Sequence, residues 1–112
     1  QQPRQKLLLV LKIRSAKNLP SVNTFGGIDS FVECHARTSG DFKKKKGADA
    51  VSLKSKSVAR TTVVRNDLNP AFGQTLELYG LAFRPEHFIQ FVLWDWNFTE
   101  NVLIGHTHLS VV

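Results

Sequence analysis

The sequence predicts an all-β fold in which two antiparallel sheets pack as a sandwich, and three observations support this prediction. Six segments have the alternation or the β-branched composition of strands, turn-forming residues separate them, and no apolar stripe of helical period has a useful length. The chain has 112 residues, of which 42% are hydrophobic and 21% are charged, so it can bury one ordinary core. Six strands joined by turns are most simply arranged as two packed layers.

The first two strands are predicted at residues 7–14 and 31–36. Apolar side chains alternate along the first segment with period two, which is typical of a strand with one face on a core. Turn formers dominate residues 18–27 between the two strands. Cys34 lies on the apolar face of the second strand, and we expect it to be a small buried core residue.

A long segment without periodicity interrupts the regular pattern at residues 39–57, and we expect it to be a mobile insertion. Four further strands are predicted at residues 58–64, 75–79, 89–95 and 103–112. The strand at 89–95 has the clearest alternation, and its apolar face ends at Asp95. The whole chain, residues 1–112, is therefore interpreted as one domain that carries one insertion.

The net charge of +6 is concentrated in one stretch of the sequence. Between Arg37 and Arg60 there are eight basic residues and two acidic ones, while the remaining residues sum to zero charge. A basic segment on a neutral body suggests contact with a polyanion such as an anionic lipid surface, a nucleic acid or an acidic protein tail. The alternative is a loop that its lysines merely keep solvated.

The cellular setting predicted by the sequence is the reducing cytoplasm. Cys34 is the single cysteine, so no internal disulfide can form, and no apolar run approaches the roughly 18 to 20 residues of a membrane span. The sequence carries no signal peptide and does not begin with Met, so we expect a segment of a longer protein.

Four short motifs, taken in order, resemble those of the C2 domain family. They are Leu19-Pro20, the segment from Asn23 to Asp29 followed by Phe31, the segment from Leu68 to Phe72, and the segment from Leu93 to Asn97 followed by Leu103-Ile104-Gly105. The resemblance covers nearly the whole chain outside the insertion. It implies an antiparallel Greek-key β-sandwich of eight strands whose loops at one end bind calcium and phospholipid.

The order of the strands resembles the permuted topology of phospholipase C and novel protein kinase C members. In that topology two more strands follow the one that contains Gly105, so up to two family strands are missing at the C-terminus. A sheet edge left open in this way has unpaired backbone groups and invites pairing with another chain. A protein partner at such an edge is therefore one expectation.

The resemblance also implies where calcium would bind. C2 domains that use calcium gather acidic residues in two loops, and the matching positions here are Asn23, Asp29, Asp95, Asn97 and Glu100, with Asn101 as the alternative to Glu100. Two positions are amides, which repay less of the cost of dehydrating a doubly charged ion. We therefore expect a degenerate site that binds Ca²⁺ weakly or not at all. Alternatively, Asp95 orients backbone amides and Asp29 starts a strand.

Three aromatic residues are predicted on turns at the same end: Phe25, Trp96 and Phe98. Exposed rings that gather together indicate a surface that becomes buried in something else, and Trp and Phe suit the headgroup boundary of a membrane. The rival interpretation is that Trp96 or Phe98 folds back over the end of the sandwich.

Basic residues in and beside the insertion would assist docking on an anionic leaflet, each contributing about 1 kcal/mol at low salt. These residues are Lys43, Lys44, Lys45, Lys46, Lys54, Lys56 and Arg60. We therefore expect a peripheral membrane-targeting module that binds anionic phospholipid with weak calcium dependence or none. The second hypothesis is a C2 domain that has lost lipid and calcium binding and contacts a protein partner.

Other functions have less support from the sequence. The motifs of common RNA-binding folds are missing, so nucleic acid is not the expected partner. The four histidines cannot be combined into a set of nucleophile, base and orienting group, so we expect neither an enzyme nor a small-molecule substrate. His106 and His108 share one face of the last strand, but no further metal ligand stands at a suitable spacing.

Overall fold

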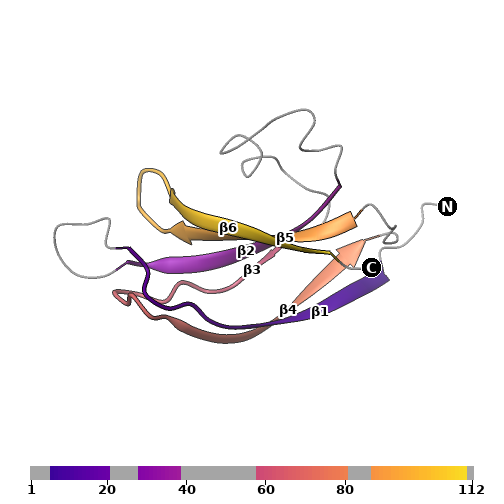
Figure 1. Cartoon of the computed structure of the whole chain (residues 1–112), viewed down its shortest axis with the longest axis horizontal. Coiled ribbons are helices and arrows are strands. Elements are labelled where there is room, and N and C mark those ends of the chain that lie inside the picture. The colour runs from indigo at the N-terminus through magenta and orange to yellow at the C-terminus, as the bar shows by residue number, and fades with distance from the viewer. Residues whose placement is uncertain (1–5, 21–27, 39–57, 81–86, 111–112) are drawn as a thin grey trace.

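The computed structural model describes residues 6–20, 28–38, 58–80 and 87–110 (Figure 1). Six strands account for most of these residues, and no helix occurs among them. The strands are β1 (Lys6–Ser15), β2 (Ser30–Thr38), β3 (Val58–Arg60), β4 (Ala71–Gly80), β5 (His87–Asp95) and β6 (Val102–Ser110). None of the described residues forms a helix that is long and apolar enough to cross a bilayer.

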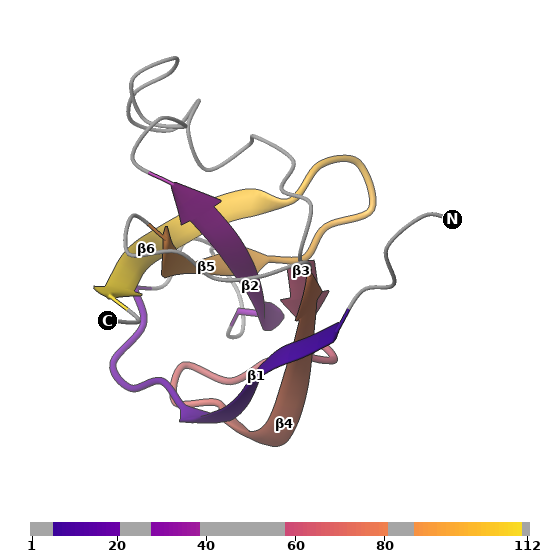
Figure 2. The ribbon, with the colours of Figure 1, turned by 90° about the vertical axis from the view of Figure 1, so that its right-hand side faces the viewer.

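The strands form two layers, one of β1 and β4 and the other in the order β3-β2-β5-β6. All pairings between named strands are antiparallel. The two layers lie face to face in Figure 1, and the view along the strands in Figure 2 shows β1 and β4 below the larger sheet. The predicted all-β antiparallel sandwich is therefore confirmed.

The core lies between the two sheets, where the period of two directs alternate side chains. In β2, Val32 and Cys34 face the core, while Glu33 and His35 lie on the opposite face of the sheet. The buried cluster comprises Val32, Cys34, Phe72, Leu76, Leu78 and Ile89. Burial raises the pKa of the Cys34 thiol to about 12, and this residue has the core position that the sequence predicted.

Two strands differ from their predicted bounds by four residues at one end, and the others by no more than two. The strand expected at 58–64 ends at Arg60, because the Thr61 Oγ1 accepts the N–H of Val32 (3.0 Å) and so takes a donor that a continued ladder would use. β4 starts four residues earlier than predicted. Gly73 has φ +56° there, next to a register shift, and breaks the alternation on which the prediction relied.

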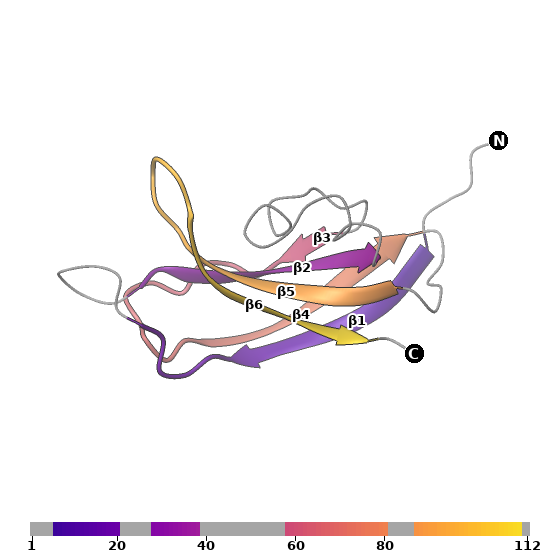
Figure 3. The ribbon, with the colours of Figure 1, turned by 45° about the horizontal axis from the view of Figure 1, so that its top comes forward.

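The segments that follow β1, β3 and β5 all leave the sandwich at one end. β1 ends where β4 begins, since Ser15 pairs with Ala71, and β2 begins where β5 ends, since Ser30 pairs with Asp95. Figure 3 shows the β5–β6 hairpin and the connection between β3 and β4 at this common end. Two backbone bonds continue the pairing of β1 with β4 beyond the strand ends: Ala16 N–H to the Pro70 oxygen (3.0 Å) and Leu19 N–H to the Leu68 oxygen (3.0 Å).

Some sequence predictions concern residues outside the described part of the chain. The insertion at 39–57, with Lys43, Lys44, Lys45, Lys46, Lys54 and Lys56, is among them. So is the segment 21–27, which contains Asn23 and Phe25. The predictions made for these residues remain predictions.

Candidate binding site at the loop end

Residues 28–29, 64–67 and 95–101 come together at the common end of the sandwich, which we call the loop end. Their position follows from Ser30, which pairs with Asp95 in β5 and forms an isolated bridge with Val64. The bridge consists of two backbone hydrogen bonds, of 3.0 Å and 2.8 Å. Because Asp29, Arg65 and Trp96 each lie one residue beyond these paired positions, the ladder brings the three residues to the same place.

Asp95 is a buried carboxylate at the base of the loop end, with 1% of its surface exposed. Its Oδ1 accepts a hydrogen bond from the N–H of Asp29 (3.1 Å), and the Trp96 N–H donates in return to the backbone oxygen of Asp29 (2.7 Å). The Asp95 Oδ2 is also buried and has no hydrogen-bond partner within the described ranges. Asp95 therefore fixes the relation between the start of β2 and the end of β5.

Asp29 is engaged through both of its carboxylate oxygens by the segment that follows Val64. Oδ1 accepts a hydrogen bond from the N–H of Asn66 (2.8 Å), and Oδ2 lies 4.0 Å from Nη1 of Arg65. The second contact is an ion pair rather than a hydrogen bond. The Arg65 guanidinium also lies 5.0 Å from the centre of the Trp96 ring, within the range of a cation–π interaction.

Two aromatic side chains follow β5. The rings of Trp96 and Phe98 pack edge to face, with their centroids 4.8 Å apart and an interplanar angle of 63°. Trp96 is partly buried, whereas Phe98 is 94% exposed. The two rings thus differ: Trp96 is held at the rim by Arg65 and Phe98, while Phe98 projects into solvent. Phe25, the third predicted ring, lies outside the described residues.

The structure brings together some of the positions that the family resemblance assigns to calcium. Asp29 and Asp95 are in contact, and the Asn97 side chain donates through Nδ2 to the backbone oxygen of Asp95 (3.4 Å). The Asn97 N–H donates to Oδ1 of Asn101 (3.2 Å), and the side chains of Asn101 and Glu100 are both exposed. Asn101 is therefore the residue that turns back onto the loop.

These residues can be compared with the needs of a calcium ion, which takes about six to eight oxygen ligands and favours carboxylates. Of the carboxylate oxygens of Asp29 and Asp95, the buried Asp95 Oδ2 alone lacks a partner among the described residues. No group of three or more His, Cys, Asp or Glu in this part of the chain is arranged to hold a metal ion. The oxygen atoms of the described residues do not by themselves provide the ligands that a calcium ion needs.

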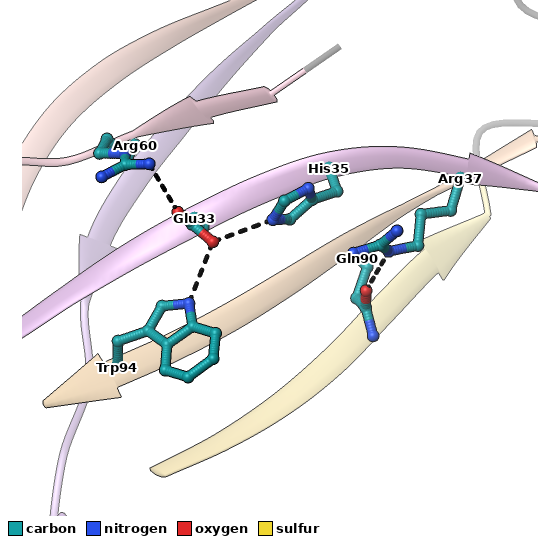
Figure 4. A network of polar contacts seen from close by, with 6 residues as sticks. All are labelled: Glu33, His35, Arg37, Arg60, Gln90 and Trp94. Atoms are coloured by element: carbon teal, nitrogen blue, oxygen red, sulfur yellow. Dashed lines mark hydrogen bonds and ion pairs between the residues drawn. The ribbon is translucent and has the colours of Figure 1, made fainter. Parts of the chain in front are cut away.

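Arg60, one of the predicted lipid-binding residues, is tied to the outer face of the larger sheet. Its Nη2 pairs with Oε2 of Glu33 (2.9 Å), and Oε1 of Glu33 contacts His35 Nε2 (3.0 Å) and accepts the indole N–H of Trp94 (3.0 Å) (Figure 4). Burial lowers the pKa of His35, which outweighs the opposite effect of the Glu33 bond. Arg37 contacts Oε1 of Gln90 beside this network.

Arg65 is the member of the loop end that the sequence patterns did not single out. It stands just before the turn formed by Asn66 to Pro70, where the sequence pattern indicates an ordinary solvated charge. A usable signal was available, since Arg65 lies three residues before the family motif that runs from Leu68 to Phe72. The ion pair between Arg65 and Asp29 depends on the bridge between Ser30 and Val64, which no local sequence pattern predicts.

Comparison with known proteins agrees with this geometry. The family model of the C2 domain matches residues 7–112, so the chain belongs to the C2 domain family. C2 domains are typically membrane-binding or calcium-binding modules and are generally not catalytic. A comparison with curated protein sequences finds no match.

Solved structures with a similar fold include two other C2 domains. That of a plant extended synaptotagmin 1 has a TM-score of 0.68 and 21% identity over 96% of this chain and 71% of that chain. A C2 domain of RIM2 has a TM-score of 0.63 and 20% identity over 96% of this chain and 81% of that chain. At these identities the likeness concerns the fold.

A human group IVD cytosolic phospholipase A2 also contains a similar region. Its TM-score is 0.68 and its identity 12%, over 91% of this chain and 12% of the phospholipase chain. The present chain therefore corresponds to a small part of that enzyme. The likeness again extends to the fold alone.

Proposed function

We propose that this domain docks on anionic phospholipid membranes through its loop end, with little or no dependence on calcium. Phe98 carries the proposal, because it is an almost fully exposed ring at the tip of a hairpin and is supported from behind by Trp96. Holding an apolar side chain in water is unfavourable by about 25 cal/mol per Å² of apolar surface, and this cost is relieved in the headgroup boundary.

The net positive charge of the chain supports an acidic membrane rather than a neutral one. Arg65 is beside the aromatic pair, and the net charge of the chain is +6. The predicted lipid-binding lysines of the insertion, with Arg60 in β3, would add attraction to an anionic leaflet. Asn23 and Asn97 in place of acids lower the negative charge that a calcium ion would otherwise have to neutralise.

Vesicle co-sedimentation of wild type and Phe98→Ala tests this proposal. The vesicles contain phosphatidylcholine with or without phosphatidylserine, and EGTA removes calcium. We expect the wild type to bind the phosphatidylserine vesicles. The affinity of Phe98→Ala for these vesicles should be lower by a factor of about ten or more, since the variant lacks the ring that would be buried in the membrane. Because Phe98 is so exposed, the variant should keep the wild-type melting temperature.

Val10→Ala is the matched control, since Val10 is an exposed apolar residue of β1 and lies away from the loop end. It should bind vesicles as the wild type does. Equal losses in both variants, or a Phe98→Ala variant that binds like the wild type, would contradict docking through the loop end.

A protein-binding module is the alternative, and the exposed edge region of the larger sheet favours it. In the described part of the chain β6 pairs with β5 alone, and Val102 and Leu109 of β6 are exposed apolar residues. A strand with a free edge can accept a partner strand. Wild-type protein that binds no vesicle composition, with or without calcium, would favour this alternative.

A further inference from the structure

Two exposed histidines stand close together on β6, the last strand in the order β3-β2-β5-β6. His106 and His108 are separated by one residue, and alternate residues of a strand share a face. The register agrees, since His106 pairs with Val92 and His108 with Gln90 in β5. Gln90 in turn pairs with His35, so this is the outer face of the larger sheet.

We propose that His106 and His108 form a chelating pair for a divalent transition-metal ion, with Zn²⁺ and Cu²⁺ as the expected examples. Imidazole nitrogen is a ligand that suits zinc, copper and nickel, whereas calcium and magnesium select oxygen. The pair lies on a different part of the molecule from the loop end. The inference therefore goes beyond the proposed membrane docking and does not depend on it.

The spacing of the two residues suits a shared ion. A strand rises about 3.3 Å per residue, so the Cα atoms of His106 and His108 are about 6.6 Å apart. A tetrahedral Zn²⁺ with Zn–N distances of about 2.0 to 2.1 Å requires nitrogens about 3.3 Å apart. Because the second side-chain torsion of histidine is broad, the two rings can turn toward one ion while the backbone stays paired with β5.

The His108 ring is already supported by a neighbour. It packs edge to face against Phe88, with the ring centroids 5.6 Å apart and an interplanar angle of 68°. Phe88 pairs with Ser110, which lies on the other side of His108 from His106 along β6. The contact therefore supports the ring from the side away from His106. A ring that is held in this way loses less freedom when it binds an ion.

The surroundings of the pair determine how many ligands it supplies. Its cross-strand partners Val92 and Gln90 are uncharged, and Arg37 contacts Gln90 from β2, on the far side of β5. The described residues contain no group of three or more His, Cys, Asp or Glu that could hold a metal ion. The two histidines thus supply about half of the usual four ligands of a zinc site, and water or a donor from a partner completes the shell.

Calorimetric titration of the lipid-free protein with zinc chloride tests the proposal. The titration is run at about pH 7.5, since metal binding requires unprotonated imidazole. We expect the wild type to bind Zn²⁺ at least about tenfold more tightly than His106→Gln or His108→Gln, because the second nitrogen of a chelate binds within one molecule. In NMR spectra, Zn²⁺ should shift the ring resonances of both histidines, whereas Ca²⁺ should leave them unchanged.

A double variant with Thr107→His and His108→Thr is the matched control. It keeps the composition and moves one imidazole to the other face of β6. All three positions from His106 to His108 are exposed, so the melting temperature should stay that of the wild type. The double variant should bind Zn²⁺ as weakly as the single variants. His87→Gln, which changes an imidazole outside the pair, should bind like the wild type.

The proposal is overturned if the wild type gives no zinc-dependent heat, or if its affinity is within about threefold of both single variants. It is also overturned if the double variant binds as tightly as the wild type, since zinc would then follow the number of histidines rather than their shared face. The titration contains no lipid and the vesicle experiment contains no zinc. Either proposal can therefore fail while the other stands.

Discussion

Asp95 combines two properties that rarely coincide in one side chain, since it is a carboxylate and it is almost completely buried. One oxygen is satisfied by the backbone N–H of Asp29. The other lacks a hydrogen bond within the described residues, although a buried polar atom without a partner is costly. Asp95 ends the apolar face of β5, and its structural role is to fix the position of Asp29, the residue immediately before β2.

Comparison of Asp95→Asn with Asp95→Ala isolates this task, because both variants lose the charge. Asn keeps an oxygen that can accept the Asp29 N–H, whereas Ala leaves that donor without its partner. We expect the free energy of unfolding of Asp95→Asn to exceed that of Asp95→Ala by about 1 to 3 kcal/mol. Urea denaturation measures the difference.

Glu100→Ala serves as the reference for that experiment, since Glu100 is an exposed acid of the same hairpin. Its stability should stay within about 0.5 kcal/mol of the wild type. If Asp95→Asn and Asp95→Ala were equally stable, the hydrogen bond to Asp29 would not contribute to the fold.

At this scale the sequence could name acids and rings but not their partners. Periodicity and turn residues reveal that Asp29 and Asp95 lie at strand ends and that Phe98 lies on a turn, whereas the hydrogen bond between Asp29 and Asp95 depends on the register of two strands. The stacking of Arg65 on Trp96 joins residues that are far apart in the sequence. It depends on how two loops approach each other, and a single sequence does not contain that information.

The outer face of the larger sheet shows how elements are joined by one side chain. Glu33 of β2 is bonded to Arg60 of β3 and to Trp94 of β5, and it also contacts His35 of its own strand. β3 has only three residues, so side-chain contacts of this kind supplement a short backbone ladder. Glu33 therefore connects three neighbouring strands.

The buried His35 makes the stability of this face depend on pH. Charged groups near it are Glu33 and Arg37 on β2 and Arg60 on β3, and burial is the main cause of its lowered pKa. The unfolded chain binds a proton on His35 near pH 6.5, while the folded chain does so only at lower pH. The contribution of His35 to stability is therefore complete above pH 6.5 and is lost as the pH falls toward the folded pKa.

Urea denaturation at about pH 7.5 and at about pH 5.5 measures this effect. The wild type should lose stability between the two values, and His35→Gln should lose less, because its amide does not titrate. His106→Gln, which changes an exposed histidine, should keep the wild-type pH dependence. A His35→Gln variant with the same slope as the wild type would place the titrating group elsewhere.

The strands themselves could be predicted more completely than the site. Alternation and turn residues locate all six, with errors in the bounds of β3 and β4. In both cases the cause is a non-repeating feature: the Thr61 hydroxyl replaces a ladder bond, and Gly73 adopts a positive φ. Irregular features of this kind depend on contacts with another strand, so they leave no periodic trace in the sequence.

For the whole molecule, the uneven distribution of charge predicts how docking responds to salt. The stretch from Arg37 to Arg60 contains the entire net charge of +6, while apolar contact at Phe98 is insensitive to ionic strength. The two contributions can be separated, because the Debye length shortens from about 10 Å at 0.1 M salt to about 3 Å at 1 M.

A variant in which Lys43, Lys44, Lys45 and Lys46 are all changed to Gln tests the electrostatic part. At about 1 kcal/mol for each lysine, its affinity for phosphatidylserine vesicles at low salt should fall about a hundredfold or more. Its binding should also change less with salt than that of the wild type. On pure phosphatidylcholine vesicles the two proteins should behave alike, and a similar loss there would contradict an electrostatic role.

Cys34 gives the sandwich an internal reporter of its own opening. It is the only cysteine of the chain, it has no exposed surface, and burial raises its pKa to about 12. The thiolate is the form of cysteine that attacks alkylating reagents, so the folded molecule is protected both by lack of access and by lack of ionisation. The rate at which Cys34 is alkylated therefore reports the opening of the two sheets, without an added dye or an engineered thiol.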